Sequence, residues 1–220
     1  WWRGTWEKEG GGCTLNHAVH HIDIFHWMNG MPSDVTAIAS NTSHDNAEVE
    51  DLSVAICRYP NGSLAQITSS VVHHGEEQQL TFQGKNARVS VPWKVTASKS
   101  KENGFPEKDE ELEEKLQAAY EQLSNLEYEG HTAQIDDVLS AIEGKKEVLV
   151  DGHEGRKTLE LITAIYQSSS TGQTVRLPLD ETSPFYTRDG VLKNAAHFYE
   201  KKNHVVSFSE NAITTGGKYE

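Results

Sequence analysis

The segment Gly10–Trp27 constrains the fold of this chain more than any other, because it joins three consecutive glycines to a helical pattern. Apolar side chains recur there at steps of three and four residues, which predicts a helix with one buried face: Leu15, Ala18, Val19, Ile22 and Phe25. Thr14 is a suitable N-cap, and Asn29–Gly30 predicts the end of the helix. The glycines allow a sharp turn and a close approach of the backbone to a ligand.

Polar residues form a second stripe of the same predicted helix, at steps of four, three and four: Asn16, His20, Asp23 and Trp27. A histidine one turn away from an amide and a carboxylate is suited to proton transfer, since an imidazole ordinarily titrates near pH ~6.5. A structural histidine that caps or bridges helices is the alternative for His20. Asp23 either orients a histidine or belongs to a network at the helix end.

The net charge and the cysteine content limit which partners and which cellular compartment we expect for this chain. The net charge of −13 over 220 residues argues against nucleic acid or an anionic membrane as a partner. No apolar run approaches the roughly 20 residues that span a bilayer. The two cysteines, Cys13 and Cys57, predict unpaired thiols in a reducing compartment, so we expect a cytoplasmic protein.

The rest of the chain alternates between strand and helix patterns. Strands are predicted at residues 35–42, 52–57, 64–72, 80–82, 89–95 and 175–177, and helices at 109–126, 135–142 and 159–166. The turn Pro60–Gly62 predicts a hairpin, and the charged segment 99–110 a loop. Together these elements predict an α+β fold, a large mainly antiparallel sheet with helices on one face. The other face would be solvated or paired with a second subunit.

A series of short motifs runs from Trp1 to about Leu179: Arg3–Trp6, Gly10–Gly12, Asn16, His20, Ile22–Asp23, Trp27, Tyr59–Ser63, His131, Gln134–Ile135, Val150–Gly152, Glu154–Gly155, Ala164–Tyr166, Ser168 and Thr171–Gly172. Their order and spacing resemble the C-terminal domain of the Gfo/Idh/MocA oxidoreductases, the relatives of glucose–fructose oxidoreductase and inositol dehydrogenase. No single motif is specific, but the series is.

The resemblance implies a two-domain enzyme, in which an N-terminal Rossmann domain binds NAD or NADP. The C-terminal domain then supplies the substrate pocket, the catalytic histidine and a sheet often used for oligomerisation. We expect this chain to contain the C-terminal domain alone, because no Gly-x-Gly-x-x-Gly follows a strand and Leu15 stands where the third glycine belongs. The catalytic lysine of the family's Rossmann domain then has no counterpart here. The domain is expected over residues 1–180, with an extension at 181–220 that packs on this body or on a partner subunit.

The resemblance assigns the role of proton donor and acceptor to His20. Asn16 stands where many family members have an aspartate. An amide cannot ionise, so Asn16 is expected to bind a substrate hydroxyl rather than to share a proton. Asp23 is a further substrate-binding candidate, and Gly11 and Gly12 are candidates for contact with the cofactor.

Three residues from other segments are candidates for the same pocket. His131, at the start of a predicted helix, is a substrate-binding candidate, with a plain helix-entry role as the alternative. Arg3 and Trp6 are expected to face the pocket, where the indole of Trp6 would offer a flat surface for a sugar ring. Core packing is the alternative for Trp6.

Metal and covalent chemistry are not predicted. His17 and His21 are four residues apart, as in zinc-binding helices, but they lack the glutamate of His-Glu-x-x-His and a third ligand. No motif places a histidine as a base beside Cys13.

The sequence thus predicts the substrate-binding and catalytic domain of an NAD(P)-dependent oxidoreductase that acts on a sugar or polyol, inactive without its Rossmann domain. His20 would move the proton during hydride transfer. The predicted partners are the small-molecule substrate and further copies of the chain, bound through the open sheet face. Two alternatives are a non-catalytic sugar-binding or oligomerisation module, and an enzyme of elimination or glycoside cleavage through a transient keto sugar.

Overall fold

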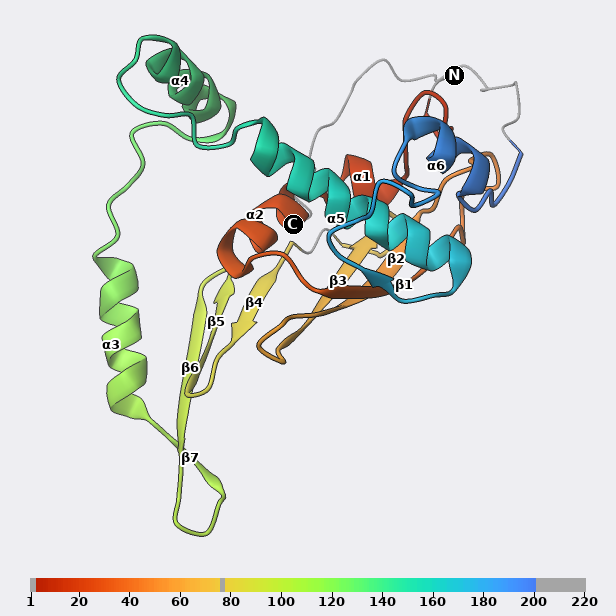
Figure 1. The fold of residues 1–220 in the computed structure, drawn as a ribbon. Coiled ribbons are helices and arrows are strands. Elements are labelled where there is room, and N and C mark those ends of the chain that lie inside the picture. The colour runs from red at the N-terminus through yellow and green to blue at the C-terminus, as the bar shows by residue number, and fades with distance from the viewer. Residues whose placement is uncertain (1–2, 76–77, 201–220) are drawn as a thin grey trace. The chain divides into compact units, whose positions relative to one another are not determined.

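The computed structural model describes residues 3–75 and 78–200, and the chain folds into two compact units (Figure 1). The described residues of unit 1 are 3–75 and 152–200, and those of unit 2 are 78–151. Each unit contains antiparallel strands and helices, so the predicted α+β class is confirmed. The strands form two four-stranded sheets, one in each unit, where the sequence predicts one large sheet.

Unit 1 is built on an antiparallel sheet with the strand order β3-β2-β1-β8. Its strands are β1 (Asp34–Ser40), β2 (Leu52–Arg58), β3 (Leu64–Ser70) and β8 (Val175–Arg176). The predicted hairpin between β2 and β3 is confirmed. Tyr59 N donates a hydrogen bond to Ser63 O at 3.0 Å, and Gly62 has a φ of 85°, which favours glycine.

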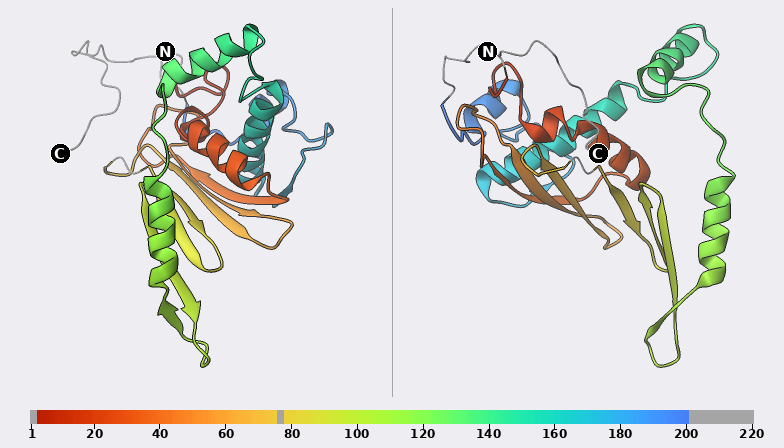
Figure 2. Two further views of the ribbon diagram at one scale, coloured as in Figure 1. Left: turned by 90° about the vertical axis from the view of Figure 1, so that its left-hand side faces the viewer. Right: turned by 180° about the vertical axis from the view of Figure 1, so that it is seen from behind.

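Helices of unit 1 cover one face of this sheet, as Figures 1 and 2 show. The helices of the unit are α1 (Cys13–Asn16), α2 (Val19–Asn29), α5 (Gly152–Thr171) and α6 (Arg188–Asn194). The face of β2 that is buried carries the small residues Ser53, Ala55 and Cys57. The larger Val54 and Ile56 lie on the open face, 38% and 44% exposed. Alternation predicts a half-buried strand here, but hydrophobicity alone does not select the face that the helices cover.

The core of unit 1 joins α2 and α5 to the sheet. Side chains that are at most 1% exposed include Ile22, Val35, Leu161, Ile162 and Ile165. Phe185 and Ala195, from the segment 181–200, are buried in the same core. The predicted domain boundary at residue 180 stays a prediction, and residues 201–220 of the predicted extension lie outside the described residues.

The predicted helix over residues 14–29 is interrupted between Asn16 and Val19. Ala18 N donates to Cys13 O at 3.0 Å, a hydrogen bond that spans five residues instead of four. The extra residue changes the angular register of the helix by roughly 100°. His20 therefore shares its stripe with later residues of α2, whereas Asn16 does not continue this stripe.

Of the two predicted ends of the interrupted helix, the C-terminal end is confirmed and the N-terminal end is not. Thr14 is not the N-cap. Gly12 precedes α1, and the buried Thr14 places its hydroxyl 2.7 Å from that of Ser53. The helix ends at Asn29 and is followed by Gly30, as predicted.

Unit 2 has the strand order β4-β5-β6-β7. Its elements are β4 (Leu80–Gln83), β5 (Ala87–Val91), β6 (Lys94–Ser100), β7 (Pro106–Lys108), α3 (Glu110–Glu121) and α4 (Gly130–Ile142). The predicted strand 89–95 is a hairpin instead, because Pro92 has no N–H to continue a ladder. The predicted loop 99–110 contains β7, and the helix predicted to reach residue 126 ends at Glu121. In the part of the chain that the structure describes, no helix has the length and apolar character to span a membrane.

Ser168 of α5 joins this helix to β1 and to the connection between α5 and β8, and its substitution tests this packing. The fully buried hydroxyl accepts a hydrogen bond from Ala37 N in β1 at 2.8 Å and donates to Gln173 O at 2.7 Å. Ser168→Ala leaves both backbone groups without these partners, so we expect a loss of about 2 kcal/mol or more in the free energy of unfolding, measured with urea. Ser169→Ala is the control, because that hydroxyl bonds only to Tyr166 O of its own helix and should cost under ~0.5 kcal/mol. Equal effects of the two changes would contradict the role of Ser168.

Candidate functional site

The first turn of α2 carries His20, the candidate proton-transfer residue. The buried Ile22 holds the opposite side of this helix on the core. The His20 side chain is exposed, and among residues 3–75 and 78–200 no hydrogen bond or ion pair engages its imidazole. An exposed imidazole without internal partners is accessible to a ligand and can exchange a proton with it, which is one requirement of general acid–base catalysis.

Asn16 holds the glycine segment that precedes α1. Its Nδ2 donates to Gly11 O at 2.7 Å and to Gly12 O at 3.2 Å. These bonds use the N–H groups of the amide and leave Oδ1 as an acceptor on an exposed side chain. The predicted contact of Asn16 with a substrate hydroxyl stays a prediction, and it would use Oδ1.

Asp23 belongs to a side-chain network near the end of α2, one of the two roles expected for it, although its partners Thr158 and His26 were not predicted. Its Oδ1 lies 2.5 Å from Thr158 Oγ1 and 3.4 Å from His26 Nε2. His26 Nε2 in turn lies 2.8 Å from Thr158 Oγ1, and both of these side chains are buried. Asp23 therefore contacts a histidine, but this histidine is His26. The spacing of three residues between Asp23 and His26 was a signal for this contact, whereas nothing in the sequence points to Thr158.

Glu50 is a buried carboxylate, 3% exposed, around which the glycine segment is built. Its Oε2 accepts a hydrogen bond from Gly12 N at 3.0 Å, and its Oε1 accepts from Thr14 N at 2.9 Å and from Tyr166 Oη at 3.1 Å. Burial raises the pKa of Glu50 above its ordinary value, and the hydrogen bonds from Thr14 and Tyr166 act in the opposite direction. The sequence does not point to Glu50, because nothing in the residues around it distinguishes it from the many other acidic residues of this chain.

Gly11 and Gly12 pack directly against this carboxylate and its tyrosine partner. A Cβ atom on Gly11 would lie 2.2 Å from Tyr166 Oη, and one on Gly12 would lie 1.9 Å from the backbone oxygen of Glu50. Internal packing thus explains why both positions are glycine. Cofactor contact at either glycine stays a prediction. At Gly12 such a contact cannot use the amide, because Glu50 already occupies it.

Trp6 lies in the core of unit 1, 4% exposed. Its ring meets the ring of Tyr166 edge-on, with centroids 4.9 Å apart, and its Nε1 donates to Ala196 O at 3.1 Å. The core-packing alternative is therefore supported, and contact of the ring with a sugar stays a prediction. The other candidate of this segment, Arg3, is exposed.

His131 lies in unit 2, as the second residue of α4. It is exposed, and its Nδ1 is 3.3 Å from Gln134 Oε1. Its helix-entry position is as expected, and its contact with a substrate stays a prediction.

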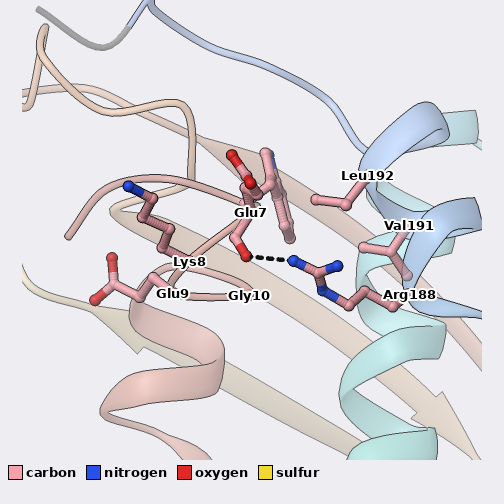
Figure 3. A pocket seen from close by; sticks show the side chains of 8 residues that line it. Glu7, Lys8, Glu9, Gly10, Arg188, Val191 and Leu192 are labelled. Carbon is pink, nitrogen blue, oxygen red and sulfur yellow. Dashed lines mark hydrogen bonds between the residues drawn. The ribbon is translucent and has the colours of Figure 1, made fainter. Parts of the chain in front are cut away.

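A cavity of about 250 Å³ opens between the segment after Trp6 and α6 (Figure 3). The residues around it are Trp6, Glu7, Lys8, Glu9, Gly10, Arg188, Val191 and Leu192. Arg188 Nη2 donates to Glu7 O at 2.8 Å, and this bond connects α6 to the N-terminal segment. His20 does not line this cavity, so the cavity is separate from the candidate proton-transfer residue.

The two thiols are poorly suited to nucleophilic chemistry. Burial raises the pKa of Cys13 to about 12 and that of Cys57 to about 11, so both are protonated at neutral pH. Within the described ranges 3–75 and 78–200, no group of three or more histidine, cysteine, aspartate or glutamate side chains is placed to hold a metal ion.

Adding one methyl group at Gly12 tests the packing around Glu50. Gly12→Ala forces the new Cβ against the Glu50 backbone, so we expect a loss of about 3 kcal/mol or more in the free energy of unfolding. Gly155→Ala is the matched control. It adds the same group inside α5, where nothing lies within 4 Å, and should stabilise by about 0.5–1 kcal/mol. Chemical denaturation measures both, and a tolerated Gly12→Ala would contradict the close approach.

The model of the oxidoreductase family C-terminal alpha/beta domain matches residues 1–177. Similar solved structures include two WlbA dehydrogenases, each in complex with NADH and UDP-GlcNAcA. The one from Chromobacterium violaceum is 28% identical with a TM-score of 0.62, and the one from Bordetella pertussis is 26% identical with a TM-score of 0.60. Each match covers 81% of this chain and 49% of the other.

A levoglucosan dehydrogenase in complex with NADH and levoglucosan shares the fold, at 18% identity and a TM-score of 0.60, with 82% of this chain and 54% of that one covered. No protein of curated function matches the sequence. The chain spans about half the length of the WlbA dehydrogenases that it matches. Since the family model covers most of the sequence, this chain belongs to the Gfo/Idh/MocA oxidoreductase family and corresponds to its C-terminal alpha/beta domain.

Proposed function

We propose that the complete protein is an NAD(P)-dependent oxidoreductase that acts on a sugar or polyol. In this proposal the chain supplies the substrate-binding surface and the proton-transfer residue His20. The observation that carries the proposal is the exposed His20 imidazole on α2, without an internal partner among the described residues, in a chain of this family. The WlbA relatives, bound to NADH and a sugar nucleotide, support the substrate class.

Oxidation of an alcohol requires the removal of a hydroxyl proton as the carbon loses a hydride. The His20 imidazole would take this proton and return it in the reverse reaction. Asn16 Oδ1 and the free oxygen of Asp23 are acceptors that would bind hydroxyl groups of the substrate. Arg3, in the same unit, is a further proposed contact.

The nicotinamide cofactor would supply the hydride acceptor when bound. This chain offers no phosphate site at the start of α1, because the buried carboxylate of Glu50 occupies the amides of Gly12 and Thr14. The nucleotide would therefore be bound mainly by another part of the complete protein. This agrees with the longer chains of the relatives, about half of which this chain covers.

Titration with NADH and with NADPH, followed by tryptophan fluorescence, tests the cofactor. Both this chain and the complete protein are titrated, and turnover of the complete protein is assayed with UDP-GlcNAcA, levoglucosan and simple polyols. We expect saturable binding by the complete protein only, and oxidation of a member of the panel. A complete protein that binds neither nucleotide would favour the sugar-binding or oligomerisation module. A transient keto intermediate without net oxidation would favour elimination or glycoside cleavage.

Substitution of His20 in the complete protein tests its role in proton transfer. We expect His20→Ala to lower kcat by about 10²–10⁴-fold, the usual contribution of a general acid–base group, with NADH binding retained. The melting temperature should change little, because the side chain is exposed. His17→Ala, three residues earlier and also exposed, is the control and should leave kcat within about twofold. Near-normal turnover of His20→Ala would remove His20 from the mechanism.

We also propose that a second copy of the chain covers the open face of the unit 1 sheet. Ile38 on β1 is 76% exposed and stands opposite Val54 on β2, while Ile56 and Leu64 are also exposed. An apolar strip of this kind on one face of an antiparallel sheet is typical of a contact surface.

Charge introduced into this strip should dissociate the assembly. We expect Ile38→Asp to shift the protein to monomer in size-exclusion chromatography with light scattering, because a carboxylate cannot be buried unpaired in an apolar interface. Thr171→Asp, at the exposed end of α5, should leave the mass unchanged. A monomeric unmodified protein at micromolar concentration would contradict the proposed contact.

A further inference from the structure

Thr158 of α5 brings two side chains of α2 together at a buried position. Its Oγ1 lies 2.5 Å from Asp23 Oδ1 and 2.8 Å from His26 Nε2. Thr158 and His26 are each 3% exposed, whereas the side chain of Asp23 is 33% exposed. The network therefore begins in the core and ends at a carboxylate that solvent reaches.

The hydrogen bonds of this network have one direction. An ionised carboxylate only accepts, so the Thr158 hydroxyl donates its single hydrogen to Asp23 Oδ1. The competing acceptor, Glu154 O, is more distant at 3.4 Å. Thr158 Oγ1 can then only accept from His26, which fixes the His26 tautomer with its hydrogen on Nε2. The order is His26 Nε2–H to Thr158 Oγ1–H to Asp23 Oδ1.

Burial of polar groups at this helix contact has a cost that apolar residues would avoid. A valine has nearly the same shape as Thr158 and would pack against α2 without a hydroxyl to satisfy. What the hydroxyl adds is a fixed position for one carboxylate oxygen of Asp23. Asp23 lies one turn after His20 on α2, so the side chain of Asp23 is a neighbour of the candidate proton-transfer residue on the helix surface.

We propose that Thr158 is a positioning residue, which together with His26 fixes the Asp23 carboxylate so that its free oxygen Oδ2 binds a hydroxyl of the substrate. The inference rests on the proposed function, since it gives Asp23 a sugar or polyol to bind. Thr158 itself is buried and does not touch the substrate.

Steady-state kinetics of the complete protein test this role, with the panel substrate of highest turnover. We expect Thr158→Val to raise KM about tenfold and to change kcat less than threefold. Thr158→Ser keeps the hydroxyl and should stay within about twofold of the unmodified enzyme in KM. In an Asp23→Ala background, Thr158→Val should have no further effect on KM, because Thr158 acts through Asp23. An unchanged KM for Thr158→Val, or additive effects in the double variant, would overturn the proposal.

Nuclear magnetic resonance of the 220-residue chain tests the network without any assay of activity. Long-range ¹H–¹⁵N correlation should show His26 as the Nε2–H tautomer, with slow exchange that Thr158→Val accelerates and Thr158→Ser preserves. An Nδ1–H tautomer, or exchange that Thr158→Val leaves unchanged, would overturn the network. Failure of the proposed function has a different signature, which is normal turnover of His20→Ala or no nucleotide binding, with the His26 signals intact.

Discussion

The Glu50 carboxylate is the group on which the arrangement of α1, α2 and α5 depends. Buried carboxylates are costly unless their oxygens are matched by donors. Here Glu50 meets two backbone N–H groups at the start of α1 and the Tyr166 hydroxyl from α5. The Glu50 side chain, just before β2, thereby links α1 and α5 to the sheet. The position of α2, and with it that of His20, follows from where α1 begins.

The pKa of the next residue along the chain, Asp51, is shifted in the opposite direction from that of Glu50. Its burial acts to raise its pKa, but hydrogen bonds from His44, Thr42 and Ser43 outweigh this effect and hold the pKa below the ordinary value of 3.8. Glu50, with its pKa raised, joins helices to the sheet, whereas Asp51 closes the loop between β1 and β2. Two consecutive carboxylates thus organise two different parts of unit 1, the contact of the helices with the sheet and the loop between β1 and β2.

Periodicity and turn chemistry predict most elements, because these signals are local. The turn Pro60–Gly62 and the end of α2 at Asn29 are examples. Three features were not predictable, two of them because they depend on partners that are distant in the sequence. Ser53, Ala55 and Cys57 on β2 are buried because helices cover that face, and Glu50 is buried because donors surround it. The helix between Asn16 and Val19 is interrupted by a bond from Ala18 to Cys13. The proposed role of His20 is inferred from the family resemblance, whereas the exposure of its imidazole is observed in the structure.

The amide at Asn16 is explained by the glycine segment that it holds. Its Nδ2 donates to two carbonyl oxygens, those of Gly11 and Gly12. An ionised aspartate at this position would place a second set of acceptors against those carbonyl groups and could donate nothing to them. In this chain the side chain of Asn16 therefore holds the closely packed glycine segment, but unlike a carboxyl group it cannot share a proton with His20. Proton transfer by His20 would then proceed without a carboxylate partner at Asn16, whose N–H groups are already committed to the glycine segment.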